Sequence, residues 1–265
     1  MAKTKPAAEE HDRAVDEDGQ PFLSHLLELR QRLLRSVLAV AILFFPIYYF
    51  ANSIYEFVAA PLMANLPAGS GMIATEVASP FMTPFKLAAY SAVFAAMPYM
   101  LHQAWAFVSP GLYLREKTFA LPLLVSSIAL FYLGMTFAYF IVFPLVFQFF
   151  AGVTPVGVTM MTDINKYLDF VIKMFFAFGF SFEIPIATFL LVSSGISSTA
   201  SLKAKRPYVI VGCFVVGMLL TPPDVISQVL LAVPMWMLFE LGVWFAQFAE
   251  RRAKAADEAT TPEET

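Results

Sequence analysis

Six stretches of the chain are strongly apolar, and most of them are long enough to cross a lipid bilayer. They lie at 33–50, 85–108, 119–142, 171–192, 208–220 and 225–248. A hydrocarbon core about 30 Å thick requires ~20 apolar helical residues, and lipid gives backbone groups no partner outside a helix or a closed barrel. Only 14% of the residues are charged, against roughly 25% in a soluble domain. The sequence therefore predicts an all-α, polytopic membrane protein with six transmembrane helices.

The fifth stretch is the shortest of the six. With a rise of about 1.5 Å per residue, residues 208–220 cover only ~20 Å. The fifth and sixth stretches could therefore form a re-entrant hairpin, or cross a locally thinned bilayer. The sequence leaves both possibilities open.

Lysine and arginine are concentrated on one side of the predicted helices. Short loops rich in these residues stay in the cytoplasm, which predicts that both termini are cytoplasmic (N-in/C-in). We expect disordered acidic tails at 1–20 and 250–265 and one membrane domain at 21–249. On the other side, residues 52–84 contain a short amphipathic piece ending at Pro61, which we expect to cap the outer surface.

One acid lies in the middle of the fourth stretch. Glu183 is ten residues from both Lys173 and Ser193, so about 15 Å of helix separates it from either end. Intramembrane acids are costly and usually face a bundle interior or a wet cavity. We interpret Glu183 as functional; the alternative is a structural carboxyl beside a kink at Pro185. Lys173 follows Asp169 by four residues, which predicts a helical ion pair.

Two other acids lie near the expected cytoplasmic surface. Glu28 belongs to the amphipathic segment FLSHLLELRQRLLRS, and an ion pair with Arg32 one turn later explains it locally. Glu116 lies in the short loop SPGLYLREKTF, where a solvated charge is the ordinary expectation. Neither acid indicates a function by itself.

The stretch LLTPPDVISQ is typical of a helix start. Thr221 and Asp224 form a capping-box pattern with Pro222 at the first helical position, which gives Asp224 a structural role. Gln228 lies one turn further into the membrane, where an amide needs a partner or water.

The chain lacks the residue patterns that are typical of nucleotide-binding and metal-binding proteins. The chain contains neither a G-x-x-x-x-G-K-[ST] nor a G-x-G-x-x-G phosphate loop. Its one cysteine and three scattered histidines give no metal-ligand spacing. We therefore expect no cofactor, no metal, no nucleic-acid partner and no enzymatic activity.

Seven segments, in order along the chain, resemble the motifs of one family. They are HLLELRQRLL (25–34), MIATEVASPF (72–81), WAFVSPGLY (105–113), DINKYLDFV (163–171), FGFSFEIP (178–185), KRPYVIVGCFVVGMLLTPPD (205–224) and LFELGV (238–243). From about Pro21 to Gln247 the chain is similar to the TatC family, the multi-spanning receptor subunits of the twin-arginine protein translocase. One departure is Lys117, where many relatives carry arginine, so the loop contact is assigned to Glu116 alone.

The resemblance implies a glove-shaped receptor and scaffold in the bacterial cytoplasmic (inner) membrane. Such a protein binds Arg-Arg signal peptides and exports folded proteins, driven by the proton-motive force. The implied partners are the lipid bilayer, the single-span subunits TatA and TatB, and further copies of the chain in a homo-oligomeric receptor complex.

The resemblance also assigns roles to single residues. Glu28 and Glu116 correspond to the acids that bind the two arginines, because a guanidinium makes forked, charge-assisted bonds to a carboxylate that lysine does not reproduce. Arg30 supports this site, Phe107 contacts the signal and Pro61 matters for assembly. The intramembrane polar set for docking TatA and TatB comprises Glu183, Met218, Thr221 and Gln228.

An ion-coupled small-molecule secondary transporter is the alternative function. In that case Glu183 would carry the coupling ion. Such transporters are built from related halves with broken helices in matching positions, and no such halves are visible in this sequence.

Overall fold

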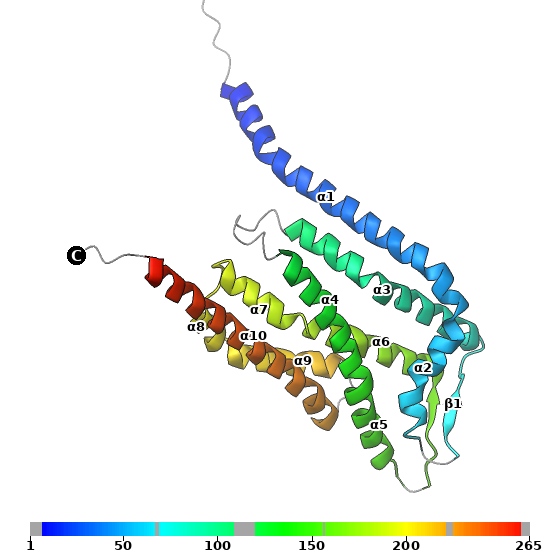
Figure 1. Cartoon of the computed structure of the whole chain (residues 1–265). Coiled ribbons are helices and arrows are strands. Elements are labelled where there is room, and N and C mark those ends of the chain that lie inside the picture. The colour runs from blue at the N-terminus through cyan, green and yellow to red at the C-terminus, as the bar shows by residue number, and fades with distance from the viewer. Residues whose placement is uncertain (1–6, 67–68, 109–119, 156, 221–224, 261–265) are drawn as a thin grey trace, which may run out of the picture.

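A computed structural model describes residues 7–66, 69–108, 120–155, 157–220 and 225–260. Its helices slant side by side in one bundle, with α1 and α3 along one edge, α7, α9 and α10 along the other, and α4 and α6 between them (Figure 1). We call the end that carries α2, β1 and β2 the cap end, and the end where α1 begins and α10 finishes the terminal end. The elements are α1 (Ala7–Tyr49), α2 (Ala51–Met63), β1 (Gly71–Ile73), α3 (Ser79–Val108), α4 (Ala120–Phe137), the π-helical turn η3 (Ala138–Val142), α5 (Phe143–Gly152), β2 (Met161–Asp163), α6 (Ile164–Ser181), α7 (Ile184–Ser193), α8 (Thr199–Ala204), α9 (Arg206–Leu220) and α10 (Val225–Thr260).

Each of the six predicted apolar stretches lies in a helix or in a run of consecutive helices. Within the described residues, four runs are long and apolar enough to cross a membrane: Leu26–Tyr49, Leu121–Gly152, Ile164–Ser193 and Gln228–Phe248. Helix α3 is long but more polar, and α9 has only 15 residues. The prediction of an all-α polytopic membrane fold is confirmed.

Two helices extend into the segments assigned to tails. Helix α1 begins at Ala7, and α10 continues to Thr260. Both extensions are rich in Ala, Glu, Asp and Arg or Lys. Alanine and the long charged residues favour helices, and opposite charges one turn apart add support. The helices therefore continue beyond the apolar stretches, while the domain boundaries at 20 and 250 stay predictions.

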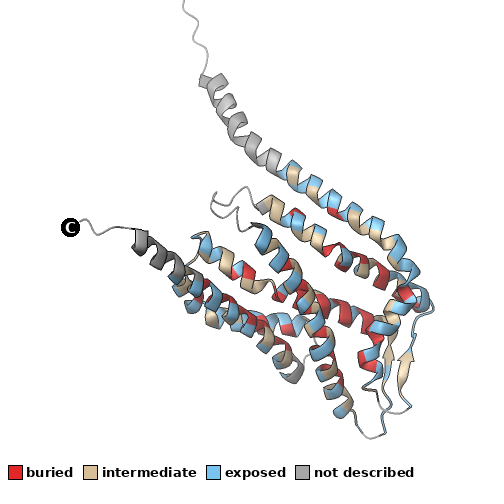
Figure 2. Ribbon diagram, in the orientation of Figure 1, coloured by how far each residue is buried: buried red, intermediate tan, exposed pale blue. Residues whose placement is uncertain are grey.

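The closest packing at the centre of the bundle is between α4 and α6, where the buried colour concentrates (Figure 2). A Cβ atom on Gly134 would overlap the Phe178 carbonyl, and one on Gly179 would lie 2.6 Å from the Phe131 ring. Small residues let membrane helices approach in this way. Phe131 and Phe178 are fully buried as a result. In contrast, α1 packs mainly on α3 and leaves most of its surface exposed.

Proline determines how the cap helix α2 is attached. The helix does not end at Pro61 as expected but continues to Met63. Pro61 is buried and has no N–H, so the Phe57 carbonyl one turn earlier has no helical donor. Tyr139 of η3 donates its hydroxyl to that carbonyl at 2.7 Å, and its ring stacks on Phe57 at 4.6 Å. Because Pro61 leaves the Phe57 carbonyl without a helical donor, this carbonyl can bind Tyr139 and so attach α2 to the bundle.

The Tyr139→Phe variant tests this attachment. It leaves the Phe57 carbonyl without its donor, and we expect the free energy of unfolding to fall by about 1 kcal/mol. In a Pro61→Ala background the new N–H can donate to the same carbonyl, so the cost should shrink. Thermal unfolding of the four proteins of this double-mutant cycle measures the difference. An equal cost in both backgrounds would contradict the role given to Pro61.

Two distant segments are clasped together at the cap end. Strand β1 pairs in parallel with β2, with Gly71 opposite Met161 and Ile73 opposite Asp163. The Asp163 carboxylate caps α6 by accepting from the N–H groups of Asn165 and Lys166, each at 3.0 Å. It also accepts from the Thr75 N–H at 3.0 Å and from the Thr75 hydroxyl at 2.6 Å. Two of the motifs, 72–81 and 163–171, therefore meet in this clasp.

The clasp predicts a defined pH dependence. The Thr75 hydroxyl, followed by the neighbouring backbone N–H groups, lowers the pKa of Asp163 to about 2 from 3.8. The ionised carboxylate therefore stabilises the fold above its unfolded-state pKa, and this contribution is lost as the pH falls towards the folded-state pKa. We expect Asp163→Asn to lower the melting temperature near neutral pH. The difference in melting temperature between this variant and wild type should become smaller below about pH 4. A difference in melting temperature that does not change with pH would contradict the stabilising role of the ionised Asp163 carboxylate.

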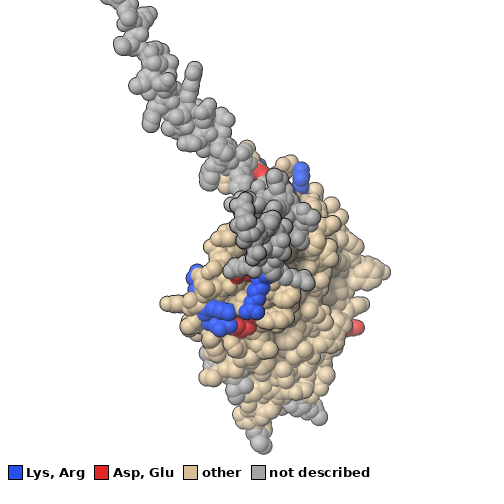
Figure 3. All heavy atoms as spheres, turned by 60° about the vertical axis from the view of Figure 1, so that its left-hand side comes forward, with Lys and Arg blue, Asp and Glu red and all other residues tan. Residues whose placement is uncertain are grey.

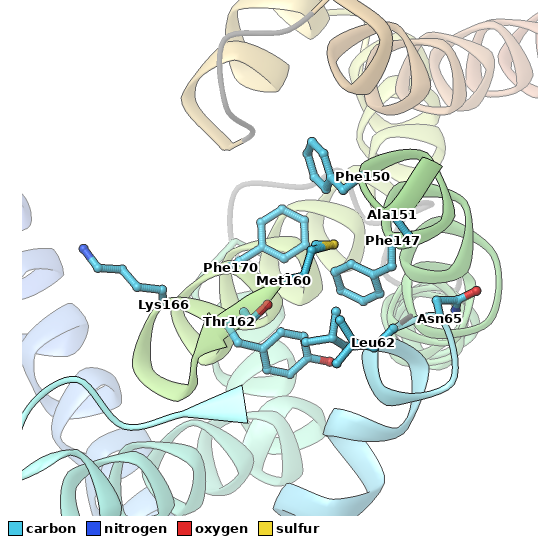
Figure 4. Close-up of a pocket in the computed structure, with 11 residues that line it drawn as sticks. Leu62, Asn65, Phe147, Phe150, Ala151, Met160, Thr162, Lys166 and Phe170 are labelled. Atoms are coloured by element: carbon cyan, nitrogen blue, oxygen red, sulfur yellow. The ribbon is translucent and has the colours of Figure 1, made fainter. Parts of the chain in front are cut away.

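An apolar cavity of 190 Å³ lies below the cap helix (Figure 4). Leu62 of α2, the rings of Phe147 and Phe150 of α5, and Phe170 of α6 face it, whereas the Lys166 side chain extends away. Helix α2 therefore contacts the bundle around this cavity, and Val58, Ala59 and Leu62 bury its apolar side in the main core.

Candidate functional site

Glu28 is held on the side of α1 that faces α3. Its Oε1 accepts from Nε of Arg32 at 2.9 Å and from Nη2 at 2.5 Å. Nη1 of Arg32 donates to Oε1 of Gln103 on α3 at 3.3 Å. The predicted Glu28–Arg32 ion pair is confirmed, and the Glu28 side chain remains 37% exposed. The carboxylate is thus fixed in place, already paired with one guanidinium, and open to solvent.

The other residues assigned to this site lie close to the same level of the bundle. Arg30 is exposed on α1, and Phe107 is half-buried in the last turn of α3. Helices α1 and α3 are antiparallel (Figure 1), so the contact between Arg32 and Gln103 puts Phe107 near the level of Glu28. Glu116 follows in 109–119, outside the described residues. Helix α3 therefore ends, at Val108, near the level of the first acid.

Glu183 occupies a break between two helices. Helix α6 ends at Ser181 and α7 begins at Ile184, so the predicted kink at Pro185 is confirmed. The side chain is half-buried, and the Ser127 hydroxyl of α4 lies beside it. Among the described residues, no group donates to its buried Oε1. An unpaired buried acceptor is costly and calls for an explanation, which supports a role for this acid beyond packing.

Sequence reasoning missed Ser127 and the Trp105 indole that donates to it. Ser127 is 1% exposed, and its Oγ accepts from Nε1 of Trp105 on α3 at 3.3 Å. The Trp105–Ser127 bond thus links α3 to α4 beside the break that carries Glu183. The available signal was a hydroxyl in the apolar run LLVSSIALF, paired with an indole in the motif WAFVSPGLY.

The polar set assigned to partner docking is only partly assembled. Gln228 of α10 donates from Nε2 to the Phe214 carbonyl of α9 at 2.8 Å, so its amide holds these two helices together. Met218 is exposed on α9. Thr221 and Asp224 lie in 221–224, outside the described residues. The structure does not bring Glu183 into contact with Met218 or Gln228.

A groove of 610 Å³ lies between α3, α6 and α9. Its lining includes Ser181 and Ile184, which lie on either side of Glu183 in the chain. Aromatic and aliphatic side chains line it, and Lys173 lies at its edge. The predicted Asp169–Lys173 pair is wrong, because Asp169 forms its ion pair with Lys86 of α3 at 3.7 Å. Spacing within one helix could not predict Lys86, because it belongs to a neighbouring helix. Lys173 does not pair with Asp169 and lines the groove instead.

Charges gather in one area at the terminal end, near α8 and α10, in a surface that is otherwise largely uncharged (Figure 3). One partly exposed contribution is the ion pair of Arg206 with Glu240, at 2.5 Å between Nη2 and Oε2. It joins the start of α9 to α10, so it links the motifs 205–224 and 238–243. Sequence spacing alone gives no indication of this pair.

Comparisons with known proteins agree on one family. Residues 24–234 match the family "Sec-independent protein translocase protein (TatC)". The TatC protein of Azotobacter chroococcum mcd 1 is 62% identical over 93% of this chain and 97% of its own length. That of Escherichia coli K12 is 55% identical over 91% and 94%.

A solved structure has the same fold. A crystal structure described as "Twin Arginine Translocase Receptor- TatC" superposes with a TM-score of 0.77 at 37% identity, covering 85% of this chain and 99% of that chain. These similarities support a translocase component and give no support to the secondary transporter. The chain belongs to the TatC family of multi-pass membrane proteins, the Sec-independent protein translocase components.

Proposed function

We propose that the chain is the signal receptor and core scaffold of a twin-arginine translocase and has no enzymatic activity of its own. The observation that carries the proposal is the fixed, partly exposed carboxylate of Glu28 on the α1–α3 contact. The similarity to a structure named as the translocase receptor supports it. The cargo consists of folded proteins with Arg-Arg signal peptides.

Glu28 and Glu116 provide the two anionic contacts in this proposal. Arg32 holds Glu28 through Oε1, so the second oxygen can accept from an incoming guanidinium. Arg30 supports this site with a neighbouring positive charge, and Phe107 packs against the apolar part of the signal. A planar guanidinium fits this geometry better than an ammonium ion.

The terminal end faces the cytoplasm in this proposal, and the membrane is the bacterial inner membrane. Lysine and arginine near the helix ends support that orientation. TatA and TatB dock on the intramembrane polar residues around Glu183, and several copies of the chain assemble in the receptor complex. The proton-motive force drives transport.

The proposal is tested by export into inverted membrane vesicles that contain this chain with or without TatA and TatB. We expect a folded reporter with an Arg-Arg leader to be transported only when all three are present, and a Lys-Lys leader to fail. Equal transport of both leaders would contradict the receptor role. Uptake of a small solute by vesicles with this chain alone would favour the transporter.

A further inference from the structure

The groove between α3, α6 and α9 is large enough to hold a ligand. Its volume of 610 Å³ falls within the roughly 300–1,000 Å³ of small-molecule sites. Apolar side chains line it on two sides, among them Phe176 and Phe180 of α6 and Val216 and Leu220 of α9. The lining segment 173–184 belongs to a run that is long and apolar enough to cross a membrane. Lipid therefore surrounds this groove.

The groove has the length of one lipid leaflet. Along α6 and the α6–α7 break its lining extends from Lys173 to Ile184, and these eleven residues rise about 16 Å in a helix. Half of a hydrocarbon core about 30 Å thick is ~15 Å. Lys173 marks the end towards the cap, because α6 begins directly after the cap strand β2. An acyl chain that starts at Lys173 can therefore follow the groove to the middle of the membrane.

Positive charge is in excess at the cap end of the groove. On α6, Asp169 lies one helical turn from both Lys166 and Lys173. The Asp169 carboxylate pairs with Lys86 of α3 at 3.7 Å. Across the described ranges, no other acid forms an ion pair with any of these three lysines. Three cations thus share one carboxylate, and Lys173, which lines the groove, has no anionic partner.

The depth of Lys173 matches the headgroup level of the leaflet at the cap end. The 30 residues of the run Ile164–Ser193 rise about 45 Å, so the first turns of α6 extend beyond the hydrocarbon core. Lys173 is exposed, and its flexible stem lets the ammonium reach that level. Tyr90 of α3 lines the same groove with its ring against Phe176 at 6.0 Å. The groove thus joins a cationic end to an apolar wall.

We infer that this groove binds an anionic phospholipid of the leaflet at the cap end. The phosphate pairs with Lys173, and one acyl chain lies along the apolar wall. A zwitterionic headgroup is bound less well, because its own cation would approach Lys86 and Lys166. The inner end of the groove reaches the break at Glu183, but the inference requires neither the signal site nor the partner subunits proposed above.

The experiment uses the purified full chain in phosphatidylcholine vesicles with a trace of phosphatidylglycerol that carries a photoactivatable acyl chain. After irradiation, mass spectrometry of peptides identifies the labelled residues. We expect labels on residues that line the groove, such as Phe176, Phe180 and Val216. The same photoactivatable chain on a phosphatidylcholine headgroup should label these positions about fivefold less.

Variants of Lys173 test the headgroup contact. Lys173→Gln removes the charge, so it should lower labelling of the groove by phosphatidylglycerol about fivefold and leave labelling by phosphatidylcholine unchanged. Lys173→Arg keeps the charge and should label like wild type. Lys203→Gln is the matched control, because Lys203 is an exposed lysine of α8 that does not line the groove. It should leave groove labelling by both lipids unchanged.

Three results would overturn the inference. They are equal labelling of the groove by the two lipids in wild type, a phosphatidylglycerol preference that survives Lys173→Gln, and a groove that neither lipid labels. The last result would favour a partner helix as the occupant. No cargo or partner subunit is present in these vesicles, so each of these results leaves the proposed export function untouched.

Discussion

The Glu28→Gln variant is expected to capture an Arg-Arg signal peptide about tenfold less well than wild type, and Glu116→Gln to do the same. Glutamine keeps the shape of the side chain but removes the charge that strengthens a guanidinium–carboxylate bond. In the structure, Arg32 already fixes the Glu28 carboxylate against α3, so little ordering is needed when the signal binds. Site-specific crosslinking of a labelled peptide to inverted vesicles measures the loss.

Glu56 provides the control, because it is an exposed acid on α2 at the opposite end of the molecule. Glu56→Gln should crosslink like wild type. A Lys-Lys peptide should bind wild type as weakly as the Arg-Arg peptide binds Glu28→Gln. Undiminished crosslinking in both the Glu28 and the Glu116 variants would refute the assigned site.

Replacing Glu183 by alanine should have the second large effect, on partner docking more than on signal binding. Its Oε1 is buried without a donor among the described residues, while the side chain as a whole is partly exposed. A partner helix with a polar side chain at this depth can contact the exposed part of this carboxyl group. We expect copurified TatA and TatB to fall about tenfold, with peptide crosslinking nearly unchanged. Quantitative mass spectrometry of the complex in mild detergent measures both subunits.

The hydroxyl next to Glu183 allows a matched comparison. Ser127→Ala removes the hydroxyl beside the acid and should reduce docking by a smaller factor. Ser126→Ala alters the adjacent exposed serine, which bonds only the Pro122 carbonyl at 2.9 Å, and should have no effect. Normal copurification and transport by Glu183→Ala would count against this role.

The sequence was sufficient for features governed by local chemistry. Hydropathy located the six apolar stretches, and Pro185 located the break between α6 and α7, because lipid thickness and the missing proline N–H act on neighbouring residues. The ion pair of Glu28 with Arg32 followed from helical spacing. These features need no knowledge of how the helices are packed.

Features that depend on packing between distant segments could not be predicted. The pair Lys86–Asp169 joins α3 to α6, and the pair Arg206–Glu240 joins the consecutive helices α9 and α10 across 34 residues. Ser127 became relevant only when α4 met the α6–α7 break. The strands β1 and β2 have three residues each, too short for an alternating pattern to be recognised.

The pairing of β1 with β2 sets an order of events during biosynthesis. The paired residues Gly71 and Met161 are separated by all of α3, α4 and α5. Bringing such remote segments together requires closing a long loop, which is slow compared with forming local helices. Both strands must also have reached the same side of the bilayer. Strands β1 and β2 can therefore pair only after the third apolar stretch has been inserted into the membrane. Until then, the nascent chain lacks this contact between its distant segments.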